Sequence, residues 1–243
     1  MGAYAMNNPA PRVVVVGLAS CFGCQLQITN AEAHLTDVLG QIDLRYWQLA
    51  SSDPMPEDFD VAVIEGAVTT EESLATVRRL REAARVVIAV GACANLAGIP
   101  GMAAAGFDDR TAEVYADGAP SACGTMIAPR AVPDVIDVLQ RAIYGSNRKD
   151  STSTLCGECK LNDRGCFYGR GIMCLGLVTR AGCGARCVAL DRPCNGCAGL
   201  SPNANLRTAH AVCEEAGIDA ARFDKALEMF NQVNPARRID ADD

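Results

Sequence analysis

Cysteine is the residue that most constrains how this chain can fold. The sequence holds 13 cysteines among 243 residues, and eight of them, from Cys156 to Cys197, fall within 42 residues. Secreted domains built on disulfides are short and carry an export signal, and a reducing compartment opposes structural disulfides. The first eleven residues lack a basic segment followed by an apolar stretch, so we expect a cytoplasmic protein. Clustered thiols in such a protein indicate metal ligation or redox chemistry.

Charge and hydropathy argue against two classes of partner. Lys and Arg number 22 and Asp and Glu 29, which gives a net charge of −7. An acidic chain repels nucleic-acid phosphates and anionic lipid. The first apolar stretch, residues 13–19, is far shorter than the roughly 20 residues that cross a bilayer. We therefore expect neither nucleic-acid binding nor a membrane span.

Short β-branched runs alternate with helical patterns in the first part of the chain. The runs that predict buried strands are residues 12–18, 42–49, 60–65 and 85–90. Helical patterns cover residues 25–39, 70–84 and 132–143. This alternation predicts an α/β fold with a flavodoxin-like, doubly wound parallel sheet whose strands lie in the order 2-1-3-4.

The composition changes at a polar stretch, residues 145–154, which we interpret as a linker. It separates a flavodoxin-like domain, residues 1–148, from a small irregular module, residues 149–243. Gly and Cys dominate residues 155–200, which hold too few large apolar groups for an ordinary core. Bound metal is expected to supply the missing cohesion. Two amphipathic helices, residues 206–216 and 222–230, are predicted to follow.

Three thiols come directly after predicted strands. Cys21 and Cys24 follow the first strand, and Cys93 follows the fourth. Because the carboxyl ends of parallel strands meet at one edge of a sheet, we expect these thiols to lie together, with Glu65 from the third strand beside them. The alternative is a set of small buried cysteines beside a redox CxxC pair.

The eight clustered cysteines form two quartets by their spacing. The first is Cys156-x2-Cys159-x6-Cys166-x7-Cys174, and the second is Cys183-x3-Cys187-x6-Cys194-x2-Cys197. Four thiolates suit either a structural zinc ion or a cubane iron–sulfur cluster. Each quartet has one CxxC pair and two isolated thiols, a pattern that favours the four-iron cluster. Zinc remains the alternative.

Five motifs occur in an order that resembles the small, electron-transferring subunit of nickel–iron hydrogenases. They lie at residues 19–27, 64–68, 90–94, 175–183 and 194–197. The sequence is most similar to the delta-type subunit of the cytoplasmic bidirectional, NAD(P)-linked group, also called sulfhydrogenase. The likeness runs from about residue 12 to about residue 235.

The resemblance implies three iron–sulfur clusters, each expected to be of the 4Fe-4S type. Three proximal ligand positions fall on Cys21, Cys24 and Cys93, with Glu65 nearby. The medial ligands would be Cys183, Cys187, Cys194 and Cys197. The distal ligands would be Cys156, Cys159, Cys166 and Cys174.

The fourth proximal ligand departs from the family pattern. Relatives supply it from a Gly-Cys-Pro-Pro turn, where this chain has Ala128, Pro129 and Arg130. Cys123 lies five residues earlier and is the candidate that a loop shift would deliver. Otherwise the cluster keeps an open iron, takes another ligand or has three irons.

The resemblance implies an electron relay without a catalytic residue for dihydrogen. The chain lacks two CxxC motifs that share one metal site, so we assign it no nickel. We expect it to connect a nickel–iron large subunit with flavin and iron–sulfur diaphorase-type subunits that reduce NAD(P). The alternatives are a hydrogenase-like subunit of another redox complex without dihydrogen activity, and a zinc-stapled binding module.

Overall fold

The computed structural model describes residues 9–30, 32–107, 126–132, 151–159 and 164–237. Cys123, the helix predicted after residue 132 and most of the predicted linker lie outside these ranges. Among the described helices, none is both long and apolar enough to cross a membrane.

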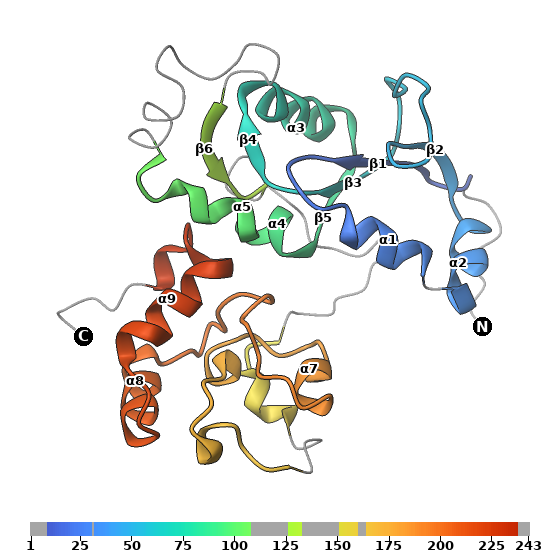
Figure 1. Cartoon of the computed structure of the whole chain (residues 1–243). Coiled ribbons are helices and arrows are strands. Elements are labelled where there is room, and N and C mark those ends of the chain that lie inside the picture. The colour runs from blue at the N-terminus through green and yellow to red at the C-terminus, as the bar shows by residue number, and fades with distance from the viewer. Residues whose placement is uncertain (1–8, 31, 108–125, 133–150, 160–163, 238–243) are drawn as a thin grey trace.

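The main sheet has four parallel strands (Figure 1). They are β1 (Arg12–Gly17), β2 (Asp43–Trp47), β3 (Val61–Glu65) and β5 (Val86–Val90). Their order is β2-β1-β3-β5. Since β5 is the fourth strand of this sheet along the chain, the predicted order is confirmed.

Each face of the sheet carries its own apolar cluster, which accounts for the near-continuous apolar runs of its strands. Val14 and Val16 of β1 pack in one core with residues of α3 (Glu71–Ala83). Val13 and Val15 point to the opposite face and pack with Val61. Alternate side chains of one strand thus stabilise two separate cores.

Helix α3 begins close to its predicted position because its first turn is well capped. The Thr70 hydroxyl accepts the Ser73 backbone N–H, and the Ser73 hydroxyl accepts the Thr70 N–H. Glu71 and Glu72 also place negative charge in the first turn, where the helix dipole favours it.

The single helix predicted over residues 25–39 is wrong in one respect, because two helices occupy this stretch. They are α1 (Gly23–Thr29) and α2 (Glu32–Leu39). The Thr29 hydroxyl donates to the Leu26 carbonyl at 2.7 Å, and the Asn30 N–H also bonds to this carbonyl. Side chains of this kind compete for the backbone and disfavour a continuous helix.

A second, antiparallel sheet was not predicted. It pairs β4 (Val68–Thr70) with β6 (Met126–Arg130). The short helices α4 (Gly91–Leu96) and α5 (Gly98–Gly101) follow β5, and the 3-10 helix η1 covers Met102–Ala104.

The cysteine-rich module, residues 151–200, contains little regular structure, as its composition predicts. Its described residues form the 3-10 helices η3 (Leu155–Gly157), η5 (Tyr168–Arg170) and η6 (Leu175–Leu177), and the single-turn helix α7 (Arg186–Ala189). The two predicted terminal helices are confirmed as α8 (Leu206–Glu215) and α9 (Ala220–Asn231), followed by η7 (Pro235–Arg237).

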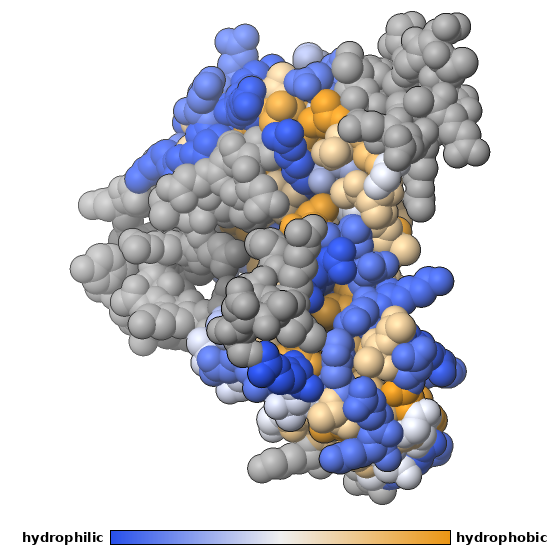
Figure 2. Space-filling view, turned by 90° about the vertical axis from the view of Figure 1, so that its left-hand side faces the viewer, coloured by the Kyte–Doolittle hydropathy of each residue, from blue (hydrophilic) through white to orange (hydrophobic). Residues whose placement is uncertain are grey.

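The terminal helices and the cysteine-rich module contact the short helices that follow β5. Helix α9 packs beside α5 (Figure 1). The Leu96 side chain lies against the backbone of Gly199, where an added Cβ would stand 2.8 Å from Leu96 Cδ1. Figure 2 shows that the described surface on the α8 and α9 side is largely hydrophilic, with smaller apolar areas between.

Candidate functional site

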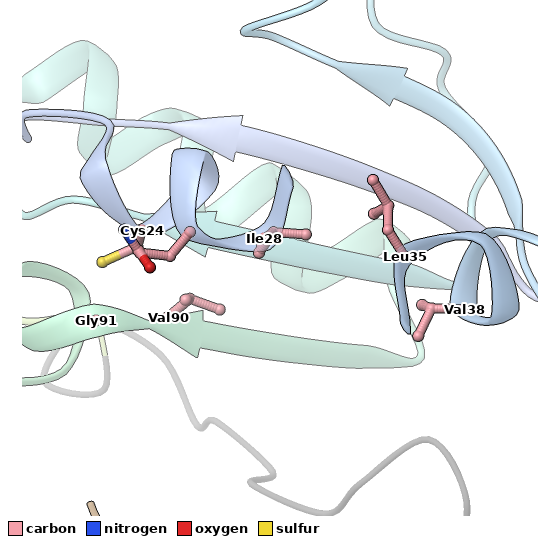
Figure 3. Close-up of a pocket in the computed structure, with 7 residues that line it drawn as sticks. Cys24, Ile28, Leu35, Val38, Val90 and Gly91 are labelled. Atoms are coloured by element: carbon pink, nitrogen blue, oxygen red, sulfur yellow. The ribbon is translucent and has the colours of Figure 1, made fainter. Parts of the chain in front are cut away.

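The carboxyl ends of β1 and β5 bring Cys21, Cys24 and Cys93 to one rim, as their sequence positions predict. Phe22 adopts φ 59°, and this left-handed residue turns the chain from β1 into α1. A Cβ added to Gly91, at the end of β5, would lie 2.3 Å from Cys24 Sγ (Figure 3). Burial raises the pKa of Cys24, and the charges of Glu65, Cys93 and Cys21 raise it further.

Glu65, the last residue of β3, joins the rim to the sheet through hydrogen bonds. Its side chain is only 2 % exposed. Oε1 accepts the Cys24 backbone N–H at 3.1 Å, and Oε2 accepts the Gln25 N–H at 3.4 Å. Glu65 therefore holds the first turn of α1 in place and lies beside Cys24, as predicted.

An apolar cavity of about 500 Å³ opens beside Cys24. It lies between α1, α2 and the end of β5 (Figure 3). Its lining residues are Cys24, Gln27, Ile28, Leu35, Val38, Val90 and Gly91. This cavity was not predicted, because its lining comes from three separate elements.

The first quartet is gathered around the loops from η3 to η6. Burial raises the pKa of Cys156 to about 11, and the charges of Cys174, Cys159 and Cys166 contribute next. If all four thiols were ionised, their negative charges would repel one another unless a cation lay among them. Bound iron would supply that positive charge and keep the thiols deprotonated.

The second quartet is gathered around α7 and the turn that follows it. Burial raises the pKa of Cys197, and the charges of Cys194, Cys187 and Cys183 add to the effect. Cys194 Sγ also accepts the backbone N–H of Gly196 at 3.4 Å. The donor set of each quartet therefore fits the ligation of an iron–sulfur cluster by four cysteines.

One peptide unit connects the two quartets. The backbone N–H of Cys194, from the second quartet, donates to Sγ of Cys174, from the first, at 3.2 Å. Both side chains are buried. The two groups of thiols are therefore neighbours, which their spacing in the sequence does not reveal.

Thr179 is a buried hydroxyl beside the second quartet, and the sequence reasoning missed it. Its Oγ1 donates to the Leu175 carbonyl at 2.6 Å and lies 3.6 Å from Cys194 Sγ. That carbonyl already accepts the N–H groups of Val178 and Thr179. In this structure Thr179 Oγ1 accepts from the Cys194 thiol. A rotation of the hydroxyl would turn its proton toward a thiolate at Cys194, and the Leu175 carbonyl would keep its two backbone donors. The only sequence signal was its place within the motif at residues 175–183.

Two further results concern the predicted ligands. Ala128, Pro129 and Arg130 belong to β6, and Cys123 lies outside the described residues, so the fourth proximal ligand stays a prediction. Within the described part of the chain, no three His, Cys, Asp or Glu side chains are placed to hold a single metal ion.

Comparisons with known proteins agree with the resemblance found in the sequence. Residues 21–140 match the family described as NADH ubiquinone oxidoreductase, 20 Kd subunit. The chain is 29% identical to the sulfhydrogenase 2 subunit delta of Pyrococcus furiosus, over 83% of this chain and 91% of the relative. It is 30% identical to the NAD-reducing hydrogenase HoxS subunit delta of Cupriavidus necator, over 55% of this chain and 65% of the relative.

A solved structure shares the fold. The NiFeSe hydrogenase of Dm. baculatum includes a chain that superposes with a TM-score of 0.54 at 14% identity. The match covers 79% of this chain and 95% of that one. It therefore extends beyond the parallel sheet into the second part of the chain.

Proposed function

We propose that this chain, which is similar to the delta subunits of hydrogenases, carries electrons between a nickel–iron large subunit and subunits that reduce NAD(P). The observation that carries the proposal is the convergence of eleven thiols, from distant segments, into three groups. Iron–sulfur clusters bound there would supply one-electron transfer.

The proposed ligands follow these groups. Cys21, Cys24 and Cys93 would hold a proximal cluster, with Cys123 as the candidate fourth ligand. Cys183, Cys187, Cys194 and Cys197 would hold the medial cluster. Cys156, Cys159, Cys166 and Cys174 would hold the distal cluster. We propose that each is of the 4Fe-4S type.

We propose that the large subunit covers the rim around Cys24. The apolar cavity opens there, and Leu26 on the adjoining helix α1 is 49 % exposed. Exposed apolar surface of this kind is typical of an obligate interface, and such interfaces bury on the order of several thousand Å². A separate diaphorase-type partner is supported by the likeness to the delta subunit of an NAD-reducing hydrogenase.

We also propose a cytoplasmic location and a division into two domains, residues 1–148 and 149–243. The change from a regular sheet to irregular, cysteine-rich loops supports this boundary. No nickel ligand is proposed on this chain.

The first experiment measures iron, sulfide and the visible spectrum of the anaerobically purified chain. Three cubane clusters correspond to about 12 irons per chain, and an empty proximal site leaves about eight. A colourless protein that holds zinc would refute the electron-transfer proposal and favour a zinc-stapled binding module.

The second experiment removes Cys24 in the assembled complex. Cys24→Ala should abolish dihydrogen-dependent NAD(P) reduction while the metal site of the large subunit stays assembled. Cys213→Ala is the matched control, because Cys213 is buried in α8 and packs beside Tyr168. Retained activity in Cys24→Ala would contradict the assigned role.

A second candidate function is electron transfer in a hydrogenase-like complex that has no dihydrogen activity. The absence of a thiol at Ala128, Pro129 and Arg130 favours it. Normal iron content in the purified native complex, together with no dihydrogen-dependent dye reduction, would support this candidate over the first.

A further inference from the structure

The cysteine-rich module is basic although the chain as a whole is acidic. Residues 151–200 contain six Lys and Arg against three Asp and Glu, a net charge of +3, whereas the whole chain carries −7. The part of the chain that holds eight of its thiols therefore has a net positive charge.

Four of these arginines gather around α7. Arg186 begins the helix and Arg192 follows it, and both side chains are exposed. The backbone N–H of Arg192 donates to the Cys187 carbonyl at 2.9 Å, so Arg192 is held close to the helix. Asp191 pairs with Arg164 at 2.8 Å and with Arg170 at 2.7 Å. The surface around α7 thus carries four guanidinium groups and two carboxylates, those of Asp191 and of Glu158, whose Oε2 accepts the Gly184 N–H at 3.0 Å.

Leu190 lies within this group of charges. Its side chain is 77 % exposed, the largest value among the described large hydrophobic residues. The next residue, Asp191, has a left-handed backbone with φ 55°. We call Arg164, Arg170, Arg186, Leu190 and Arg192 the α7 patch.

The α7 patch includes sequence neighbours of cysteines from both thiol quartets. Cys187, from the second quartet, is an exposed residue of α7 itself. Cys166, from the first quartet, is exposed and lies between Arg164 and Arg170 in the sequence. A protein bound to the α7 patch would therefore approach ligands of both proposed clusters.

We propose that the α7 patch is the docking surface for a soluble, acidic electron carrier of the ferredoxin type. This inference rests on the proposed function, and it adds the site and the charge of a partner. Positive guanidinium groups attract a negative carrier and accelerate its encounter. One electron passes between carrier and chain, so one is oxidised as the other is reduced, and no bond forms or breaks.

The composition of the patch favours a transient partner over a permanent subunit. Obligate interfaces are large, and their centres are depleted of charge. The α7 patch holds four arginines and one exposed leucine. Weak redox encounters, which bury less than about 1,200 Å², suit such a small and charged surface.

The test measures electron transfer from the iron-loaded full chain. The chain is reduced with dithionite, separated from the reductant, and mixed in a stopped-flow instrument with an oxidised 2Fe-2S ferredoxin of net negative charge. The rate should fall as salt rises from about 10 mM to about 1 M, because the Debye length shrinks from about 30 Å to about 3 Å. A cytochrome c of net positive charge should show no such fall.

Charge reversal at α7 has a matched control on α3. The double variant Arg186→Glu, Arg192→Glu should lower the ferredoxin rate at low salt by about tenfold or more. The double variant Arg78→Glu, Arg79→Glu makes the same change in net charge on exposed residues of another helix and should leave the rate close to wild type. Arg186→Lys, Arg192→Lys keeps the charge and should retain the rate. Leu190→Ala should lower the rate at every salt concentration.

Iron content separates the two proposals. A wild-type chain without iron would refute the proposed function and the docking inference with it. Normal iron together with equal rates in the α7 and α3 variants would overturn the docking inference alone. Binding to anionic phospholipid vesicles that is lost only in the α7 variant, with an unchanged ferredoxin rate, would assign the patch to a lipid surface and also overturn the inference.

Discussion

Replacing Gly91 with alanine tests whether the end of β5 and Cys24 form one site. Gly91 has φ +82°, and an alanine Cβ there would stand 2.3 Å from Cys24 Sγ. The left-handed backbone costs an L-residue roughly 1–2 kcal/mol. Crowding in a packed region adds about 1–3 kcal/mol. We therefore expect Gly91→Ala to lower the free energy of unfolding by about 2–5 kcal/mol.

Gly217→Ala is the matched control for the backbone contribution. Gly217 has φ +71°, and nothing lies within 4 Å of an added Cβ. The two variants should differ by the crowding contribution alone, about 1–3 kcal/mol. For a chain of this size each kcal/mol shifts the melting temperature by about 2–4 °C, so we expect Gly91→Ala to melt about 2–12 °C below Gly217→Ala.

The assay combines thermal unfolding of the iron-loaded protein, at one scan rate, with iron analysis. Displacement of Cys24 should cost Gly91→Ala about four irons per chain, the content of one cubane, while Gly217→Ala keeps them. Equal melting temperatures and equal iron contents in the two variants would refute the close approach of Gly91 to Cys24. The conclusion that the thiols of Cys21, Cys24 and Cys93 lie together at this rim would then be wrong.

Two further predictions concern Thr179 and Asp60. Thr179→Val should shift the midpoint potential of the cluster proposed at Cys194 to a more negative value, because a hydrogen bond from a hydroxyl to sulfur stabilises the reduced state. Thr179→Ser keeps the hydroxyl and should keep the wild-type potential. An EPR-monitored redox titration measures both. Hydrogen bonds from Arg12 lower the pKa of Asp60 to about 2 from 3.8, so the stability they provide is present above about pH 4 and is lost as pH falls through about 2. Thermal unfolding measured against pH should therefore show that Asp60→Asn loses less stability than the wild type between about pH 4 and pH 2. An unchanged pH dependence would contradict the assigned ion pair.

The parallel sheet was predictable because β1, β3 and β5 are near-continuous β-branched runs separated by helical patterns. Strand β4 was not predictable, because it is only three residues long and shows no periodicity of its own. It is stabilised by pairing with β6, which is distant in the sequence. Helix α4 spans six residues, all small or polar except Leu96, and is too short for a helical pattern to be detected.

The grouping of thiols followed from the sequence, but their mutual arrangement did not. Strand ends predicted the approach of Cys24 and Cys93, since topology alone brings those ends together. The bond from the Cys194 backbone to Cys174 depends on how two irregular loops fold against each other. No spacing rule describes such loops, and Thr179 was missed for the same reason.

The contact between Leu96 and Gly199 has a consequence for the electron transfer that we propose. Leu96 follows Cys93 by three residues, and Gly199 follows Cys197 by two. With no side chain at position 199, the two segments approach as closely as backbone and leucine allow. Because tunnelling decays steeply with the gap to be crossed, a methyl group at position 199 that pushed the two segments apart would slow the proposed transfer although the chain keeps every cysteine.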